Sequence, residues 1–325
     1  MKLTSPIFLQ AASAHKRGVD GLIMRFDIAD PSLPFAFMSP LDLSVTTTKN
    51  GVTTTTEYQG VQVVSVEADA DTDIIVKGDF TGNNLFAPYF NEVEDPHCTK
   101  VHVNASGLAG LYLYASIAED VKVINTESLS EFERLSSVIT EFDCSPYANV
   151  DRFALGCDNI ASIDLSPLAG VDDIELWLSA VTDLDISMLE ALQVLRINAP
   201  VVTNLDFSHN NNLTLLEIAD CVNLTSVTLG TNANMIELGI EGCPSLAAPD
   251  ISGLTGLTTL GLQRMDALTG VDLSHNTQLE SLSIGENPNL TGIDLSQNTA
   301  LKKLDADDCT ALTALDLTPC PNLEW

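Results

Sequence analysis

The chain has 325 residues, of which 45% are hydrophobic and only 6% aromatic, so it can bury a sizeable core built from aliphatic side chains. Lys and Arg number 14 against 45 Asp and Glu, which gives a formal net charge of −31. This charge makes nucleic acid and anionic membrane surfaces poor partners for the chain as a whole. An acidic surface suits a secreted or high-salt setting, and simple solubility also explains it.

Residues 1–70 carry no repeat and predict a small β-rich module. The segments 21–28, 61–68 and 73–80 have the apolar patterns of strands. Asn50-Gly51 lies between Thr-rich arms, a pattern typical of a β-hairpin. Because both faces of this hairpin are polar, we expect it to lie on the surface or to pair with neighbouring copies of the chain. We expect the module to serve for attachment and to cap the coils that follow.

The first fourteen residues resemble a signal peptide only weakly, because Ser5, Pro6 and Gln10 interrupt an already short apolar run. No stretch approaches the eighteen or so apolar residues that a spanning helix needs. No C-terminal anchor sequence is present either. We therefore expect no membrane span.

Residues 71–138 predict the irregular start of a repeat. The segment 82–96 is expected to be a loop, and after it apolar positions recur in steps of ten and eleven residues. Arg134 falls on an inward position of this pattern, which weakens the prediction of a regular coil there. Ser128 and Glu131 match a capping box, so a short helix is the alternative at this point.

Residues 139–325 predict the regular part of the repeat, most clearly from Leu213 on, where one phrase recurs every eleven residues. LTGVDLSHNTQ (268–278) and LESLSIGENPN (279–289) are two consecutive copies. The first, fourth and sixth residues of each phrase are apolar, and two phrases make one coil. We expect one continuous solenoid over 71–325, with strands stacked about 4.8 Å apart.

The ninth position of the phrase is Asn or Cys in most copies. An inward Asn amide can satisfy backbone groups that are buried where the coil leaves its strand, and a buried Cys fills the volume of a small hydrophobe. Disulfides are not expected, because neighbouring ladder side chains such as those of Cys221 and Cys243 point in parallel. The predicted structural ladder is Asn210, Cys221, Asn232, Cys243, Asn276, Asn287, Asn298, Cys309 and Cys320.

The resulting signature, L-x-x-L-x-L-x-x-N/C, resembles that of leucine-rich-repeat proteins. The paired phrases LTGVDLSHNTQ and LTGIDLSQNTA look most like repeats of the Bacteroidetes type, found in surface and phage-associated proteins. The resemblance implies a right-handed solenoid of the α/β-solenoid class, mostly β, with parallel strands and 21–22-residue coils. It also implies binding of another macromolecule along the exposed face of the sheet.

Every second phrase carries an Asp between two inward apolar residues, so we expect a row of carboxylates on an exposed sheet face. Such a row could bind a cationic ligand or Ca²⁺. The favoured interpretation is a solvated repeat surface, with Ser and Thr hydroxyls donating to the carboxylates. His209 and His275 are expected at strand ends on the surface, and no third ligand supplies a zinc site. The acidic row is Asp164, Asp185, Asp206, Asp250, Asp272, Asp294 and Asp316.

The sequence contains no phosphate-binding loop, nucleophile elbow or paired catalytic carboxylates, so we expect no enzyme, no cofactor and no metal site. It predicts a recognition or adhesion protein on a bacterial or phage exterior, which binds a protein or glycan on a cell or virion surface. The alternative is a structural virion protein of a bacteriophage, such as a decoration, fibre or tail component. That protein would assemble through its N-terminal β module.

Overall fold

A computed structural model describes the strands between residues 24 and 104, residues 105 and 107–113, and residues 120–324. The chain divides into two compact units, residues 1–129 and 130–325. The sequence places the end of the N-terminal module at residue 70, whereas the first unit extends to Leu129. The weak signal segment 1–14 and the turn residues Asn50 and Gly51 lie outside the described residues.

Strand pairing in the first unit is mainly antiparallel. One sheet has the strand order β10 (Asp120–Ile124), β8 (Cys98–Asn104), β1 (Met24–Ile28), β6 (Thr72–Gly78), β3 (Leu43–Lys49) and β4 (Val52–Tyr58). In a second group of strands, β5 (Gln62–Glu67) pairs with β2 (Pro34–Ser39), β2 with β7 (Asn84–Tyr89), and β7 with β9 (Gly110–Leu113).

These pairings test the strands expected from the sequence. The strands expected at 21–28, 61–68 and 73–80 are confirmed by β1, β5 and β6. The expectation of a loop over 82–96 is wrong, because β7 occupies part of that segment and pairs with β2 and β9. The antiparallel pairing of β8 with β1 ties the start of the traced repeat into the N-terminal sheet.

The Thr-rich hairpin is present as β3 and β4, which pair antiparallel with Lys49 opposite Val52. The hydroxyl pairs Thr46–Thr55 (2.9 Å) and Thr48–Thr53 (3.0 Å) bridge the two strands. β4 stands at the edge of its sheet, and its residues 52–57 are exposed. The hairpin therefore presents a polar edge strand.

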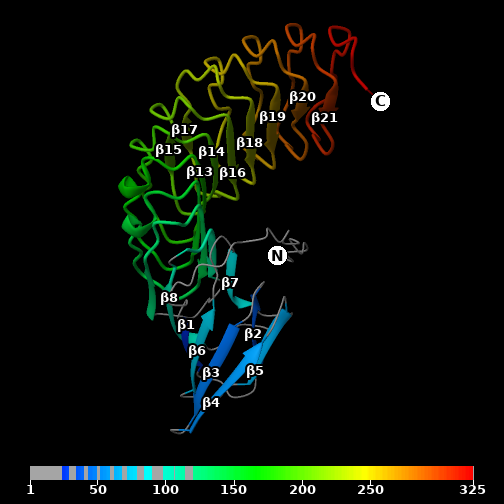
Figure 1. Cartoon of the computed structure of the whole chain (residues 1–325). Coiled ribbons are helices and arrows are strands. Elements are labelled where there is room, and N and C mark those ends of the chain that lie inside the picture. The colour runs from blue at the N-terminus through cyan, green and yellow to red at the C-terminus, as the bar shows by residue number, and fades with distance from the viewer. Residues whose placement is uncertain are drawn as a thin grey trace. The chain divides into compact units, whose positions relative to one another are not determined.

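The second unit is a mostly β solenoid built on one parallel sheet, called the main sheet here (Figure 1). Paired residues of successive strands are 21 apart up to β16, as in Arg152–Asp173, and 22 apart from there on, as in Leu215–Glu237. The coil length expected from the repeat is confirmed. The main sheet consists of β11 (Glu131–Ser136), β12 (Arg152–Cys157), β13 (Asp173–Leu178), β14 (Val194–Asn198), β16 (Leu215–Ala219), β18 (Glu237–Glu241), β19 (Thr259–Gln263), β20 (Ser281–Ser283) and β21 (Lys303–Asp305).

Each coil has a strand half and an outer half. The strands of the main sheet line the inner side of the arc in Figure 1, and the outer halves follow its outer side. In the outer halves only β15 (Asn204–Asp206) and β17 (Ser226–Thr228) form strands, and they pair with each other. Two 3₁₀ helices, η1 (Ser145–Tyr147) and η2 (Ser166–Leu168), are the helices of the described residues.

The alternative prediction of a short helix near Glu131 is wrong, because β11 occupies that segment and pairs in parallel with β12. Arg134 does point inward as the phrase predicts, and it is only 6% exposed. Its guanidinium carbon lies 5.7 Å from the centre of the Phe142 ring, so a cation–π contact helps to accommodate the charge. Burial lowers the pKa of Arg134.

The core of the solenoid changes from aromatic to aliphatic along the stack. In the first coils Phe132 stacks on Tyr147 with ring centres 3.8 Å apart, and Phe153 packs beside both. Later coils are filled by the Leu, Ile and Val residues of the phrase, of which Leu260 and Leu282 are typical. Because each coil buries its apolar edges against its neighbours, the stack forms one continuous core.

The ninth residues of the phrases form two interior lines, one behind the main sheet and one behind the outer halves. All of them are at least 90% buried. The line behind the main sheet is Cys221, Cys243, Met265, Asn287 and Cys309, and the line behind the outer halves is Asn210, Asn232, Leu254, Asn276, Asn298 and Cys320.

The two lines differ in how completely their Asn side chains are hydrogen bonded. Behind the main sheet, Asn287 Nδ2 donates to the carbonyls of Leu262 and Ile284, both at 2.7 Å, and its Oδ1 accepts from the Met265 N–H at 2.9 Å. Behind the outer halves, Asn276 Nδ2 donates to two carbonyls at 2.9 and 3.1 Å, but its buried Oδ1 has no partner among the described residues. Asn210 and Asn298 share that arrangement.

The six cysteines whose side chains the structure describes are buried free thiols. Burial raises the pKa of the Cys144 and Cys157 thiols to about 12, which keeps them protonated and unreactive. In the ladder, Cys309 Sγ donates to the Ile284 carbonyl at 3.0 Å. These thiols act as small core residues with weak hydrogen bonds.

Candidate binding sites

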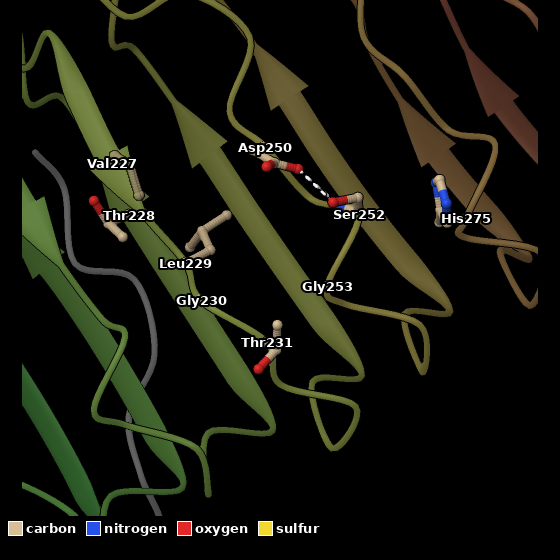
Figure 2. A pocket seen from close by; sticks show the side chains of 9 residues that line it. All are labelled: Val227, Thr228, Leu229, Gly230, Thr231, Asp250, Ser252, Gly253 and His275. Carbon is tan, nitrogen blue, oxygen red and sulfur yellow. Dashed lines mark hydrogen bonds between the residues drawn. The ribbon is translucent and has the colours of Figure 1, made fainter.

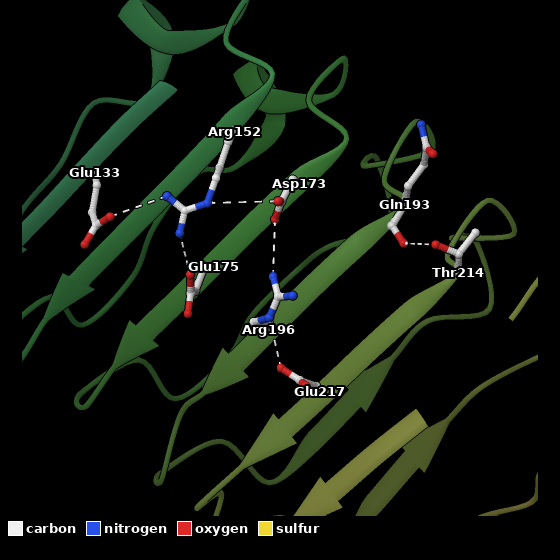
Figure 3. Close-up of polar contacts among 8 residues, drawn as sticks. All are labelled: Glu133, Arg152, Asp173, Glu175, Gln193, Arg196, Thr214 and Glu217. Atoms are coloured by element: carbon white, nitrogen blue, oxygen red, sulfur yellow. Dashed lines mark hydrogen bonds and ion pairs between the residues drawn. The ribbon is translucent and has the colours of Figure 1, made fainter. Parts of the chain in front are cut away.

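The exposed face of the main sheet carries an alternating array of arginines and carboxylates (Figure 3). Arg152 lies on β12 and contacts Glu175 at 2.7 Å and Glu133 at 3.4 Å, on the two adjacent strands. Arg196 on β14 contacts Glu217 at 2.9 Å and Asp173 at 3.6 Å. Arg152 Nε also lies 4.0 Å from Asp173, so the carboxylate of Asp173 on β13 connects the two arginines on β12 and β14.

The array is partly withdrawn from water. The side chain of Arg152 is 28% exposed, and the Glu133 and Glu175 side chains are each 16% exposed. Burial raises the pKa of Glu175, although the guanidinium groups of Arg152 and Arg196 oppose that effect. Burial in the same way raises the pKa of Asp173. Charges in this setting are screened less than fully exposed ones, and contacts to them are correspondingly stronger.

An aromatic residue stands beside the array. Gly156 lies between Leu135 and Trp177 on neighbouring strands, and a Cβ added to it would fall 2.5 Å from Leu135 Cδ2 and 3.6 Å from Trp177 Cε3. Leu135 and Trp177 therefore close over the glycine on the exposed face and remain half-buried. The glycine makes room for an aromatic platform.

Further along the sheet the same face becomes flat. Gly239 and Gly261 are paired on β18 and β19, and Cβ atoms added to them would meet only Glu217 Cγ at 3.6 Å and Gly239 Cα at 3.9 Å. At the edge of this flat part, Arg264 contacts Glu241 at 2.9 Å and Asp220 at 3.4 Å. The sheet therefore offers an Arg- and Trp-bearing half and a flat half.

The sequence analysis did not select Arg152, Arg196 or Trp177. The sequence did contain a signal for the two arginines. Lys and Arg total only 14 in the chain, and Arg152 and Arg196 occupy outward positions of strand phrases. What the sequence could not supply was the register. The register brings each arginine between carboxylates on both neighbouring strands.

The predicted acidic row lies in the outer halves of the coils, and all seven of its side chains are exposed. In each case Oδ1 accepts the backbone N–H of the residue two positions later, for example Ser274 to Asp272 at 2.9 Å. In three coils the hydroxyl donates as well, at 2.7 Å, from Ser187, Ser252 and Thr318. Hydrogen bonding to the Ser or Thr two positions later lowers the pKa of every carboxyl in the row.

The expectation that these carboxylates stand on an exposed sheet face is wrong. Asp206 ends the short strand β15, and the other six lie in segments without regular secondary structure. The reason is local: an Asp side chain that captures the N–H two residues on closes a turn and withdraws that N–H from strand pairing. Asp143 makes the same turn with Ser145 at 2.9 Å and was missed, although D-x-S-P at 143–146 matches D-x-S-P at 164–167.

The acidic row offers no preformed metal site. Among the described residues, no group of three or more His, Cys, Asp or Glu side chains is placed to hold a metal ion. Neighbouring carboxylates in the row, such as Asp272 beside Asp250 and Asp294, act on each other only through repulsion that raises the pKa. The Ca²⁺ hypothesis therefore has no geometric support in this part of the chain.

The row is interrupted at Thr228, and a pocket of about 590 Å³ lies at the interruption (Figure 2). Three successive coils contribute to it. His275, the exposed histidine next to Ser274, borders it on the last of these coils. Its lining residues are Val227, Thr228, Leu229, Gly230, Thr231, Asp250, Ser252, Gly253 and His275.

Two phrases make each coil, with the L-x-x-L-x-L-x-x-N/C signature clearest in the 22-residue coils, and one phrase of every pair adds a strand to a single parallel sheet. The chain has the leucine-rich-repeat fold. No family model and no curated protein matches the sequence of this leucine-rich-repeat chain.

Two solved structures are similar to part of the leucine-rich-repeat chain. The functional domain of InlJ from Listeria monocytogenes, described as including a cysteine ladder, is 21% identical over 67% of this chain and 52% of its own, with a TM-score of 0.31. TLR13 in its complex with ssRNA13 is 14% identical over 67% of this chain and 43% of its own, with a TM-score of 0.33. The matches span about half the length of those proteins.

The leucine-rich-repeat unit therefore presents two different surfaces, a sheet face with paired charges and outer turns with exposed carboxylates. In the described ranges no helix has the length and hydrophobicity needed to cross a bilayer. The arrangement of both surfaces suits contact with another molecule.

Proposed function

We propose that the chain is a non-catalytic recognition or adhesion protein that binds a macromolecular partner through the exposed face of the main sheet. The observation that carries the proposal is the Arg152–Arg196 array with Trp177 beside it, on a chain of net charge −31. Trp and Arg supply a large share of the binding energy at protein interfaces, especially where neighbouring groups exclude water.

The sheet also supports the proposal through its rigidity. Every strand of the array is held by parallel pairing on both sides, so β12 to β14 present Arg152, Trp177 and Arg196 in a fixed order. A preformed surface loses little conformational entropy on binding. The flat part around Gly239 and Gly261 leaves room for a partner to approach the backbone closely.

The proposed partner is a protein or glycan on a cell or virion surface, and the protein acts on a bacterial or phage exterior. The acidic repeats and the Bacteroidetes-like phrases favour that setting. A partner with carboxylate or phosphate groups would compete for the arginines, whereas one with basic groups would engage Glu133, Glu175 and Glu217.

The test is binding of labelled chain to a glycan array, to intact bacterial cells and to phage particles. Trp177→Ala combined with Arg196→Ala should lower affinity at least tenfold for any partner that binds the sheet face. Gln297→Ala, an exposed change in an outer half-coil, is the matched control and should bind as the wild type does. Equal binding by the wild type and the double variant would contradict the proposal.

A second candidate function, a structural virion protein assembling through the N-terminal β module, is favoured by strand β4. This strand is at the edge of its sheet, and Val52–Tyr58 contains no Lys or Pro of the kind that blocks edge-to-edge pairing. Another copy could add a strand there through main-chain hydrogen bonds.

Thr54→Lys on β4 tests this second function, because it places a charge on the edge strand. Sedimentation velocity of the purified chain should show self-association that the variant abolishes. A wild-type chain that remains monomeric at all accessible concentrations would exclude assembly through β4 alone.

A further inference from the structure

The pocket in the outer halves has a definite origin in the repeat. Three outer turns read Asp-apolar-Ser-polar-Asn, at 206–210, 272–276 and 294–298. Two consecutive coils depart from this pattern, because Gly230 replaces the Ser and Gly253 replaces the polar residue after it. Both glycines line the hollow of about 590 Å³.

The glycines cannot be replaced by larger residues without moving the backbone. Gly230 has φ +65°, and a Cβ on it would lie 3.0 Å from Ser208 Cα in the preceding coil. A Cβ on Gly253 would overlap the Gly230 carbonyl oxygen and lie 2.9 Å from Thr231 Cα. Close stacking of successive coils therefore requires glycine at both positions.

The groups around the hollow combine one negative charge with hydroxyls and an apolar part. Asp250 Oδ1 accepts the Ser252 N–H at 3.0 Å and the Ser252 hydroxyl at 2.7 Å, so both bonds engage one oxygen and leave Oδ2 for a ligand. Thr228 and Thr231 bring further hydroxyls to the lining, and Val227 and Leu229 bring apolar side chains (Figure 2).

We propose that the hollow between the 227–231 and 250–253 turns binds an alkylammonium group. Asp250 and the hydroxyls receive the charged head, and Val227 and Leu229 contact its methylene chain. The volume is within the range of small-ligand pockets. The ammonium belongs to a lysine side chain of a partner protein or to a free amine. This site is on the opposite side of the coil from the sheet face, so it is independent of the proposed function.

Titration of the full ¹⁵N-labelled chain with n-butylammonium chloride, followed by NMR, tests the proposal. We expect saturable shifts of the Gly230, Gly253 and His275 amides that sodium chloride at equal ionic strength and neutral n-pentanol do not produce. Asp250→Asn should weaken binding at least tenfold. An Asn side chain keeps the oxygen that accepts from Ser252, so the turn is preserved while the charge is removed.

Asp294→Asn is the matched control, because Asp294 makes the same turn with Ser296. In that turn Gln297 takes the position that Gly253 has beside the hollow. It should bind n-butylammonium as the wild type does. Shifts that fail to saturate, that spread evenly to Asp272 and Asp316, or that persist unchanged in Asp250→Asn would overturn the proposal. Tighter binding of Nα-acetyl-lysine methylamide than of cadaverine would assign the site to a protein side chain, and the reverse to a free amine.

Discussion

The two halves of a coil share the same sequence pattern but fold differently. Residues 257–267 contain strand β19, whereas residues 268–278, with the same apolar positions, contain no strand. The difference lies in the outward residue between the two inward ones, Gly261 in the first phrase and Asp272 in the second. The apolar pattern determines what is buried, and an outward Asp favours a turn by accepting the N–H two residues later.

Strand β21 shows the same side-chain hydrogen bond within the main sheet. It carries Asp305 at the outward position, and Asp305 Oδ1 accepts the Asp307 N–H at 3.2 Å, as in the outer turns. β21 ends at Asp305, whereas β19 continues two residues past the equivalent Gly261. β20 also ends at the equivalent residue, Ser283, so a short strand occurs there without Asp as well.

The largest expected effect comes from the two interior lines. Asn287→Ala removes two donated bonds and one accepted bond, and should destabilise the protein by about 3 kcal/mol, since each orphaned buried group costs roughly 1–3 kcal/mol. Asn276→Ala, behind the outer half, removes two donated bonds and an acceptor already without a partner, and should cost less, about 1–2 kcal/mol. Urea unfolding of both variants measures the difference. An equal loss of unfolding free energy in both variants would show that the two Asn side chains stabilise their half-coils equally.

The ion-pair array gives a smaller effect on the strand side. A double-mutant cycle with Arg152→Ala and Glu175→Ala should give a coupling energy of about 1–2 kcal/mol, because the pair is 2.7 Å apart and partly buried. The matched pair Lys302–Glu280 is about half exposed and should give less than about 0.5 kcal/mol. Equal coupling in the two cycles would contradict the role assigned to burial.

The flat part of the sheet should tolerate side chains that the turns do not. Gly261→Thr should stabilise the protein by about 0.5–1 kcal/mol, because the site is open and Thr favours strands. Gly242→Ala should destabilise it, since Gly242 has φ +65° and a Cβ would overlap the Asp220 carboxylate. Thermal unfolding separates the two outcomes, and a destabilised Gly261→Thr would show that the sheet face around Gly261 has no room for a side chain.

The smallest effect is the pH dependence of the outer turns. Their carboxyls have pKa values lowered by the Ser and Thr donors, so they bind fewer protons in the folded state than in the unfolded one. The stability they contribute is therefore complete above the unfolded pKa of about 3.9 and is lost as the pH falls through the lower folded pKa. Asp272→Asn with Asp294→Asn should flatten the loss of stability between pH 4 and pH 2 in urea titrations. An unchanged slope would mean that the turns do not depend on the charge.

The repeat allowed the solenoid, its coil length and its buried positions to be predicted, because apolar spacing alone determines them. Arg134 illustrates this: the phrase placed it inward, and it is inward. The position of the acidic row was predicted wrongly, because the spacing is the same for a strand and for a turn closed by Asp272. The Arg152 array depended on pairing between strands 21 residues apart, and the hollow depended on two glycines in adjacent coils. Neither is visible within one phrase.

The constant register from β16 onward has one further consequence. Pairing partners there are always 22 residues apart, so excision of residues 279–300 would join two phrases in phase and leave every remaining strand with a partner of the same kind. The solenoid can therefore be lengthened or shortened by whole coils while the packing between neighbouring coils stays the same.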